Sequence, residues 1–345
     1  MILEYFYPLS NPYDSFSIVA RQHIRALRKA ITVYEISNTT KITWNFTNRE
    51  IVAFQPWLYV ADNFLNRIGN AKRVICVDVA DSDELSANAV TRFQFCDRVI
   101  VPSRYNVEVF SKYFGKEMVF YVPHGVEDEF LKPGKVYMSE FDPIYKLKKE
   151  RNVVVIGTWV THSEWRKGID IVLAIYRSLK KMKKNVFLFV KSREKEPSYY
   201  TELMSLGGAI NSGFISTEQK VAWYDTLDLY ILGARGGGFE ITGLEAMSRG
   251  VPVISADKGS WVEYLPSFSL MPSRRSEQVL PGNPFHTGRG WEIDVGKAID
   301  KVVDIIDHID EYKKKTAEWW SSVKDRYIWQ NNEERIRNAY LGDRP

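Results

Sequence analysis

Short runs of β-branched and aromatic residues alternate with stretches of helical periodicity along most of the chain. Strands that alternate with helices of about 10–15 residues are typical of β–α–β units, whose strands lie parallel in one sheet. The pattern therefore favours an α/β fold with parallel sheets. The predicted strands are Ile2–Phe6, Ile31–Ile36, Val52–Val60, Arg73–Val79, Arg98–Val101, Val119–Val122, Asn152–Ile156, Val186–Val190, Leu227–Leu232 and Val251–Ser255.

The length of 345 residues is sufficient for two domains of about 150 residues each. Residues 133–150 are rich in Pro, Gly and Lys and lack clear periodicity, which is typical of a domain boundary. We expect a first α/β domain over 1–132, a linker over 133–150, a second α/β domain over 151–322, and a C-terminal helix over 323–345 that packs back on the first domain. Two such sheets would form a cleft lined by the carboxyl ends of their strands, where α/β folds bind ligands.

Composition excludes several classes of protein. With 45% apolar and 26% charged residues the chain is globular, and no run approaches the roughly 20 apolar residues that cross a bilayer. Cys76 and Cys96 are too few for a disulfide framework, and no Cys/His cluster has the spacing of a metal site. We expect a reduced, cytoplasmic enzyme. The net charge of +4 is modest, but residues 131–345 hold 33 Lys/Arg against 28 Asp/Glu, and this mildly basic half suits an anionic small ligand better than a nucleic acid. The alternative, solvated surface lysines, stays open.

The predicted helix over 15–30 is amphipathic, with its basic residues gathered on the face opposite the apolar one. Two interpretations of the basic face stay open. It is either the solvated outer face of the helix or a patch attracted to anionic lipid, which would place the protein peripherally at a membrane. The residues concerned are Arg21, Arg25, Arg28 and Lys29.

The most informative stretch, residues 229–255, reads as a buried strand, a glycine loop, a helix over 242–249 and a second strand. Gly236, Gly237 and Gly238 remove side chains where a helix N-terminus exposes N–H groups, an arrangement that binds phosphate. A dinucleotide fingerprint fails because Ile241 stands where its third glycine belongs, and the Gly-Lys-Ser/Thr of a Walker loop is absent. A structural alternative makes Thr242 and the glutamate three residues later a capping box without a functional role.

Three parts of this stretch resemble the signature of glycosyltransferase family 4, namely Phe239, the run Leu244–Met247 and the run Gly250–Ile254. Members of that family are retaining, metal-independent enzymes that use nucleotide sugars. The resemblance implies their GT-B fold, in which two Rossmann-like domains with parallel sheets face one another across an interdomain cleft. The family's usual motif is Glu-Gly-Phe-Gly-Leu-x-x-Leu-Glu-Ala-Met.

The two glutamates of this motif differ in how well the chain matches them. Glu245 matches the second, which in the family holds the ribose hydroxyls of the nucleotide. Gly237 stands where the family has the first glutamate, and Glu240 stands where the family often has glycine. One hypothesis is that Glu240 supplies a carboxylate to the sugar hydroxyls instead.

A second region resembles the family's Gly-Arg … Lys-Gly-x-Asp segment. Thr158 replaces the arginine of that pattern, whereas Lys167 and Gly168 match it, and Arg166 precedes them. Fixed cations in a cleft stabilise the negative charge that a departing nucleoside diphosphate gains, without any metal. The alternative is an exposed basic turn.

The first domain departs most from the family pattern. Asp14 and Ser15 align with its glycine pair, and Ser15 offers an amide or a hydroxyl to phosphate. Val77 and Asp78 stand where the family commonly has a His-Asp pair, so only the aspartate remains. A carboxylate at a strand end can orient acceptor hydroxyls or assist their deprotonation. The alternative role for this acidic stretch is to cap the next helix.

These observations predict a retaining glycosyltransferase of the hexosyltransferase type, which moves a sugar from a nucleoside diphosphate sugar to the hydroxyl of a glycan, lipid or protein-linked acceptor. We expect no metal and no cofactor. The expected catalytic residues are Lys167, Arg166 and Asp78, and the expected substrate-binding residues are Glu245, Glu240, Phe239, Gly238, Gly237, Ile241, Thr242, Ser15, Ile215 and Thr158. Two alternatives stay open: another GT-B enzyme such as a nucleotide-sugar epimerase, and a non-catalytic protein that binds sugar nucleotides.

Overall fold

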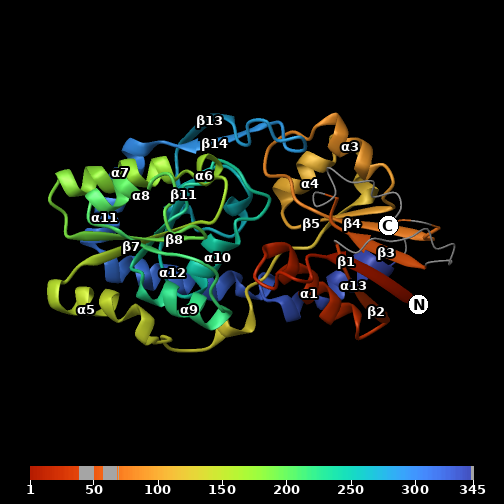
Figure 1. The fold of residues 1–345 in the computed structure, drawn as a ribbon, viewed down its shortest axis with the longest axis horizontal. Coiled ribbons are helices and arrows are strands. Elements are labelled where there is room, and N and C mark those ends of the chain that lie inside the picture. The colour runs from red at the N-terminus through yellow and green to blue at the C-terminus, as the bar shows by residue number, and fades with distance from the viewer. Residues whose placement is uncertain (39–49, 57–67, 69, 343–345) are drawn as a thin grey trace. The chain divides into compact units, whose positions relative to one another are not determined.

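The computed structural model describes residues 1–38, 50–56, 68 and 70–342 (Figure 1). The chain forms two compact units. Unit 1 consists of Met1–Gly125, Pro281–Gly288 and Arg326–Pro345, and unit 2 consists of Val126–Leu280 and Arg289–Asp325. Over the described residues each unit contains a six-stranded parallel sheet, as the alternation of strands and helices predicts.

The sheet of unit 1 has the strand order β2-β1-β3-β4-β5-β6. Its helices are α1 (Ser15–Leu27), α3 (Ala87–Phe93), α4 (Arg104–Phe110) and α13 (Glu333–Leu341). Its strands are β1 (Ile2–Tyr7), β2 (Thr32–Ser37), β3 (Ile51–Phe54), β4 (Arg73–Val77), β5 (Arg98–Val101) and β6 (Val119–Tyr121). The predicted strand Val52–Val60 corresponds to β3, and its residues 57–60 lie outside the described part of the chain.

The sheet of unit 2 has the order β12-β11-β10-β7-β8-β9, and a separate antiparallel pair joins β13 to β14. The strands are β7 (Val154–Val160), β8 (Val186–Ser192), β9 (Ala209–Asn211), β10 (Leu229–Ile231), β11 (Val253–Ala256), β12 (Leu270–Met271), β13 (Ser273–Gln278) and β14 (Arg289–Ile293). The helices are α5 (Asp142–Arg151), α6 (Glu164–Lys167), α7 (Ile169–Lys181), α8 (Tyr200–Ser205), α9 (Thr217–Thr226), α10 (Ile241–Ser248), α11 (Val295–Asp307) and α12 (Ile309–Val323). Helix α11 packs on α7, and α10 packs on α12 (Figure 1).

The boundary between the units differs from the predicted linker. The units meet in the chain at Gly125 and Val126, and much of the expected linker 133–150 is helix α5. Pro143 does not break this helix because it lies in the first turn, where its missing N–H has no helical partner to lose. The sequence pattern did not predict this helix, because the helix is strongly polar and Ile144 is the one residue that it buries.

Unit 1 buries apolar side chains on both faces of its sheet. Phe285, from the short segment Pro281–Gly288, belongs to the cluster on one face, and Trp329 and Ile336 from the C-terminal segment belong to the cluster on the other. Helix α13 packs against α1. Arg98 donates from Nη1 to the carbonyl of Ala339 at 2.9 Å, which satisfies an otherwise unpaired carbonyl at the end of α13.

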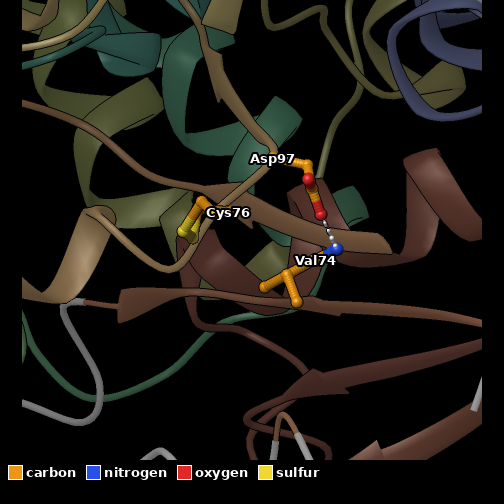
Figure 2. Close-up of a disulfide and its surroundings, with 4 residues drawn as sticks. Val74, Cys76 and Asp97 are labelled. Atoms are coloured by element: carbon orange, nitrogen blue, oxygen red, sulfur yellow. Dashed lines mark hydrogen bonds between the residues drawn. A yellow bond between two sulfur atoms is a disulfide. The ribbon is translucent and has the colours of Figure 1, made fainter. Parts of the chain in front are cut away.

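Cys76 in β4 and Cys96, just before β5, form a disulfide in unit 1 (Figure 2). The expectation of two reduced cysteines is therefore wrong. The cysteine count excludes a disulfide framework but not a single bridge. Cys96 lies in the connection between α3 and β5, where its Cα is 5.9 Å from that of Cys76, a separation that a disulfide spans. Beside the bridge, the N–H of Val74 donates to Oδ2 of Asp97 at 2.8 Å (Figure 2).

A buried aromatic and histidine cluster joins α1 to the C-terminal segment. Nδ1 of His23 lies 2.9 Å from the hydroxyl of Tyr340, which donates to the hydroxyl of Tyr5 at 3.2 Å. The ring of Trp329 packs edge-on against His23 and also contacts His124. Burial lowers the pKa of His23 from its ordinary 6.5 to about 3, so the imidazole is neutral in the folded chain at neutral pH.

We expect acid to destabilise the chain through this cluster. Between pH 6.5 and 3, His23 takes up a proton on unfolding, so the free energy of unfolding falls as the pH falls through this range. At pH 5 the loss attributable to His23 is about 2 kcal/mol. Urea denaturation at pH 7 and pH 5 measures it, and His23→Leu should show a smaller difference between the two pH values than the parent. An equal difference in parent and variant would contradict this role.

Candidate functional site

The candidate site lies at the point where the strand order of unit 2 reverses. Strand β7 pairs with β8 on one side and β10 on the other, and all three are parallel. In such sheets ligands bind beyond the carboxyl ends of the strands at this point. The loop after β7 leads into α6, and the loop after β10 contains the three glycines and leads into α10. The structure thus brings both sequence-predicted segments to one edge of one sheet.

Two glycines allow these loops to approach one another. Gly168, between α6 and α7, has a φ of +66°, a left-handed conformation that favours glycine. A Cβ on Gly168 would overlap the carbonyl oxygen of Gly233, which belongs to the loop after β10. A larger residue at position 168 would therefore push the two loops apart, along with the side chains that they carry.

The two predicted cations of α6 meet a carboxylate from the other loop. Nζ of Lys167 donates to both carboxylate oxygens of Glu240, at 2.8 and 2.6 Å, and Nη1 of Arg166 donates to Glu240 Oε1 at 3.1 Å. The side chains of Glu240 and Arg166 are 4% and 5% exposed, and that of Lys167 is 14% exposed. The alternative of an exposed basic turn is therefore wrong, because packing of the two loops against each other removes these side chains from water.

The glycine loop is held by several hydrogen bonds to its carbonyl groups. Arg166 donates to the carbonyl of Gly236 at 3.0 Å, and Ser260 Oγ donates to that of Gly237 at 2.7 Å. The hydroxyl of Tyr264 donates to the carbonyl of Glu240 at 2.6 Å, and its ring packs against that of Phe239. With its carbonyl groups bound in this way, the loop has a defined conformation before any ligand arrives.

Arg235 is the centre of an ion-pair cluster that fixes the start of this loop. Its guanidinium donates to both oxygens of Asp170, at 2.8 and 2.6 Å, and to Glu292 in β14 at 2.7 Å. It also stacks on the ring of Trp165 at 3.5 Å. Because Asp170 follows the loop after β7, Arg235 links both candidate loops to the β13–β14 pair.

Glu245 lies in α10 and is bound to two side chains of α9. Lys220 Nζ donates to its Oε1 and the Tyr224 hydroxyl donates to its Oε2, both at 2.9 Å. Burial raises the pKa of the Glu245 carboxyl, and Lys220 offsets part of this effect. Burial lowers the pKa of Lys220, but Glu245 and Glu127 together raise it above its ordinary value. Glu245 is thus a buried carboxylate with a fixed orientation.

The capping-box alternative for Thr242 is wrong. Helix α10 begins at Ile241, its N-cap position is Glu240, and the Glu240 side chain makes no capping hydrogen bond. Thr242 lies inside the first turn, and Glu245 bonds to α9 instead of to the helix terminus. The carboxylates of Glu240 and Glu245 are therefore committed to tertiary contacts.

The remaining predicted residues of unit 2 lie on neighbouring elements. Thr158 is buried in β7 and pairs with Val190 of β8. Ile215 is half-buried and follows the exposed Phe214, whose ring lies under the guanidinium of Arg193 at 5.4 Å.

The backbone just before Phe214 is held by a buried lysine. Lys191 donates to the carbonyl groups of Asn211 and Gly213. Burial lowers the pKa of Lys191 to about 8.

Asp78 and Ser15 belong to unit 1, and the other predicted site residues belong to unit 2. Asp78 is buried at the end of β4, and its Oδ1 accepts from the N–H of Val79 at 2.8 Å. It does not cap the next helix, because the N-cap of α3 is Ser86. Ser15 is the first residue of α1, which Asp14 caps by accepting from the N–H of Phe16.

Sequence reasoning missed several residues that shape these regions. His286 lies in Pro281–Gly288, and its Nδ1 accepts from the N–H of Asp81 in unit 1 at 2.8 Å. Three further residues belong to no recognised motif, and their roles depend on contacts between distant parts of the chain: Lys220, Tyr224 and Arg235. Only burial of a charge beside a recognised glutamate could have indicated Lys220, and a single sequence does not reveal burial.

The basic face of α1 is largely engaged within unit 1. Arg21 donates to the carbonyl of Pro12 at 2.6 Å, Arg28 pairs with Glu35, and Lys29 pairs with Glu333. Arg25 is exposed, as are Arg28 and Lys29. Among the helices of the described residues, none has the length and apolar character needed to cross a membrane.

Comparison with known proteins identifies a matching family model and similar folds. The family model described as "Glycosyl transferases group 1" matches residues 150–268, which include both candidate loops. A glycosyltransferase from Rickettsia africae ESF-5 has a similar solved structure, with a TM-score of 0.67 at 12% identity over 99% of each chain. This likeness concerns the fold, which is GT-B, with a Rossmann-like parallel sheet in each unit.

Two viral proteins are similar in sequence. "Uncharacterized protein 356" of Sulfolobus islandicus rod-shaped virus 1 is 30% identical over 328 residues, 91% of each chain. "Putative glycosyltransferase 45" of Sulfolobus islandicus filamentous virus is 27% identical over 249 residues, 70% of this chain and 66% of the other. The chain therefore belongs to the GT-B superfamily of glycosyltransferases, in the same family as the protein of the rod-shaped virus.

Proposed function

We propose that this chain transfers a sugar, of the hexose type, from a nucleoside diphosphate sugar to an acceptor hydroxyl, with retention of the anomeric configuration and without a metal. The observation that supports it most is the convergence of Lys167 and Arg166 with the glycine loop at the carboxyl edge of the unit 2 sheet. A diphosphate needs fixed positive charge, which Lys167 and Arg166 supply beside the N-terminus of α10.

The nucleotide is expected to lie along unit 2. In this proposal the buried carboxylate of Glu245 accepts hydrogen bonds from the ribose hydroxyls, as the second glutamate of family 4 does, while Lys220 and Tyr224 fix its orientation. The backbone near Ile215 contacts the base, and Lys191 holds the preceding carbonyl groups in place. Ile241 and Thr242 in the first turn of α10, together with Gly238 and Phe239, line the phosphates and the sugar.

The proposed chemical step uses these groups. The bond between the anomeric carbon and the diphosphate oxygen breaks, a bond from that carbon to the acceptor oxygen forms on the same face, and the acceptor proton passes to the leaving diphosphate. Lys167 and Arg166 stabilise the charge that builds on the diphosphate. In this proposal Asp78 orients the acceptor hydroxyl, and Ser15 contributes an amide or hydroxyl to phosphate.

A thermal-shift screen tests the proposal. We expect one nucleoside diphosphate and its sugars to raise the melting temperature, because a ligand that binds only the folded state stabilises it by mass action. Incubation of that donor with glycan, lipid and peptide acceptors, followed by analysis of the product's anomeric configuration, then checks transfer and retention. An isomerised donor would indicate an epimerase, and binding without turnover or hydrolysis would indicate a non-catalytic protein. Either result would overturn the proposal.

A further inference from the structure

The space beside Gly237 is filled by the side chain of Glu240. The φ angle of Gly237 is not positive, so its backbone conformation does not itself require glycine. Beyond the adjoining residues, the three heavy atoms nearest to a Cβ built on Gly237 all belong to Glu240, and its Oε1 would overlap that Cβ. The atoms that keep a side chain out of position 237 are thus the flexible end of another side chain.

The same carboxylate lies between the two cations of α6. Both of its oxygens accept from Lys167, and Oε1 also accepts from Arg166. In a nucleoside diphosphate sugar the sugar is attached directly to the second phosphate. A carboxylate in contact with the cations that bind this phosphate is therefore within a few bonds' length of the sugar hydroxyls.

We propose that Glu240 is the donor-sugar carboxylate of this chain, supplied from three residues further along because position 237 is glycine. Without donor, Glu240 orients Lys167 and Arg166. When the diphosphate binds the cations, the carboxylate accepts hydrogen bonds from sugar hydroxyls. This inference rests on the proposed function, since it names the group that binds the donor sugar in the same site.

The charge of Glu240 has a second consequence for the ligands of the site. A free nucleoside diphosphate carries more negative charge than its sugar ester and lacks the hydroxyls of the transferred sugar. Glu240 therefore repels the free diphosphate more strongly than the sugar ester. It also accepts hydrogen bonds from the transferred sugar, which the ester alone carries. The carboxylate thus favours binding of the nucleoside diphosphate sugar over binding of the nucleoside diphosphate product, and so favours product release.

An exchange of the two residues tests the position of this carboxylate. Glu240→Gly should lower kcat by at least about tenfold. Gly237→Glu should also lower it, because two carboxylates then compete for one space. The double variant Gly237→Glu/Glu240→Gly returns a carboxylate to the same space and should recover kcat to within about threefold of the parent. A double variant no more active than the weaker single variant, with all variants folded by circular dichroism, would overturn the proposal.

A binding measurement separates this inference from the proposed function. Calorimetry on parent and Glu240→Gln, with UDP against UDP-glucose and GDP against GDP-mannose, should show that the variant loses about tenfold in its preference for the sugar ester. Inorganic pyrophosphate should bind the variant about tenfold more tightly. The matched control is Glu202→Gln, an exposed carboxylate paired with Arg177, and it should change neither quantity.

The possible failures are distinguishable. If the parent binds a sugar ester but transfers nothing, the proposed transfer fails while the preference measurement still decides the role of Glu240. If the parent binds none of these nucleotides, the pyrophosphate measurement decides whether Glu240 opposes phosphate at these cations. Unchanged pyrophosphate affinity and unchanged preference in Glu240→Gln would each overturn the inference.

Discussion

Replacing Lys167 with alanine is expected to lower kcat by about 10²-fold or more, because the variant lacks a fixed cation next to the leaving diphosphate. Lys167 contacts both oxygens of Glu240 in a largely buried site, where an ammonium interacts with negative charge more strongly than it does in water. Arg166 still compensates the charge of Glu240 in the variant, so the fold should persist. Steady-state kinetics with saturating donor and acceptor measures the effect.

Lys181→Ala is the matched control for this change. Lys181 is an exposed lysine of unit 2, at the far end of the helix that follows the site, and its removal should leave kcat within about twofold of the parent. Lys167→Arg keeps the charge but not the compact shape of the ammonium, so intermediate activity is expected. A folded Lys167→Ala variant with the turnover of the parent would exclude a role for Lys167 at the leaving group.

Replacing Arg235 with alanine is expected to destabilise unit 2 by about 2 kcal/mol, because several charge-assisted hydrogen bonds of a buried guanidinium are lost. Neither carboxylate partner is left buried without compensation, since Arg274 still pairs with Glu292 and the Asp170 side chain is 50% exposed. Here the Arg235 side chain is 2% exposed and compensates Asp170 and Glu292, while it also stacks on Trp165. Denaturant unfolding followed by tryptophan fluorescence measures the change.

Arg274 offers a close comparison, because it pairs with the same Glu292 but is 80% exposed. An exposed ion pair contributes little to stability, so Arg274→Ala should unfold at nearly the denaturant concentration of the parent. If the two arginine variants were equally stable, burial of the Arg235 cluster would not be what holds the loop after β10. Of these two arginine variants, Arg235→Ala is the one expected to lower donor affinity, since Arg235 belongs to the loop after β10 and bonds to Trp165 and Asp170 beside the other loop.

Much of the fold follows from local pattern, because strands of parallel sheets carry dense apolar runs that stand out from the helices between them. Strands β7, β8 and β11 are of this kind. The pattern fails for β13, whose sequence Ser-Arg-Arg-Ser-Glu-Gln has no apolar face, and for the three-residue β9. Antiparallel pairing with β14 stabilises β13 where side-chain burial does not.

In the candidate site, too, some residues could be predicted from the sequence and others could not. Arg166, Lys167, Gly237 and Glu245 could be found because they stand at fixed spacings within two short segments that resemble a known family. Arg235 could not, because its partners Asp170 and Glu292 lie 65 and 57 residues away in the sequence. The position of the Glu240 carboxylate beside Gly237 depends on the path of the loop, which spacing alone does not fix.

The division of the chain among the two units has a practical consequence for protein engineering. The segment from Val126 to Asp325 is unit 2 interrupted only by Pro281–Gly288, so one continuous fragment would carry Lys167, Arg166, the glycine loop and Glu245, whereas Ser15 belongs to unit 1. The first 125 residues do not form a comparable fragment, because the hydrophobic core of unit 1 includes Phe285 and residues after Asp325. The proposed nucleotide contacts of unit 2 can therefore be tested on a fragment spanning Val126–Asp325, whereas the proposed role of Asp78 needs a chain that includes all three segments of unit 1.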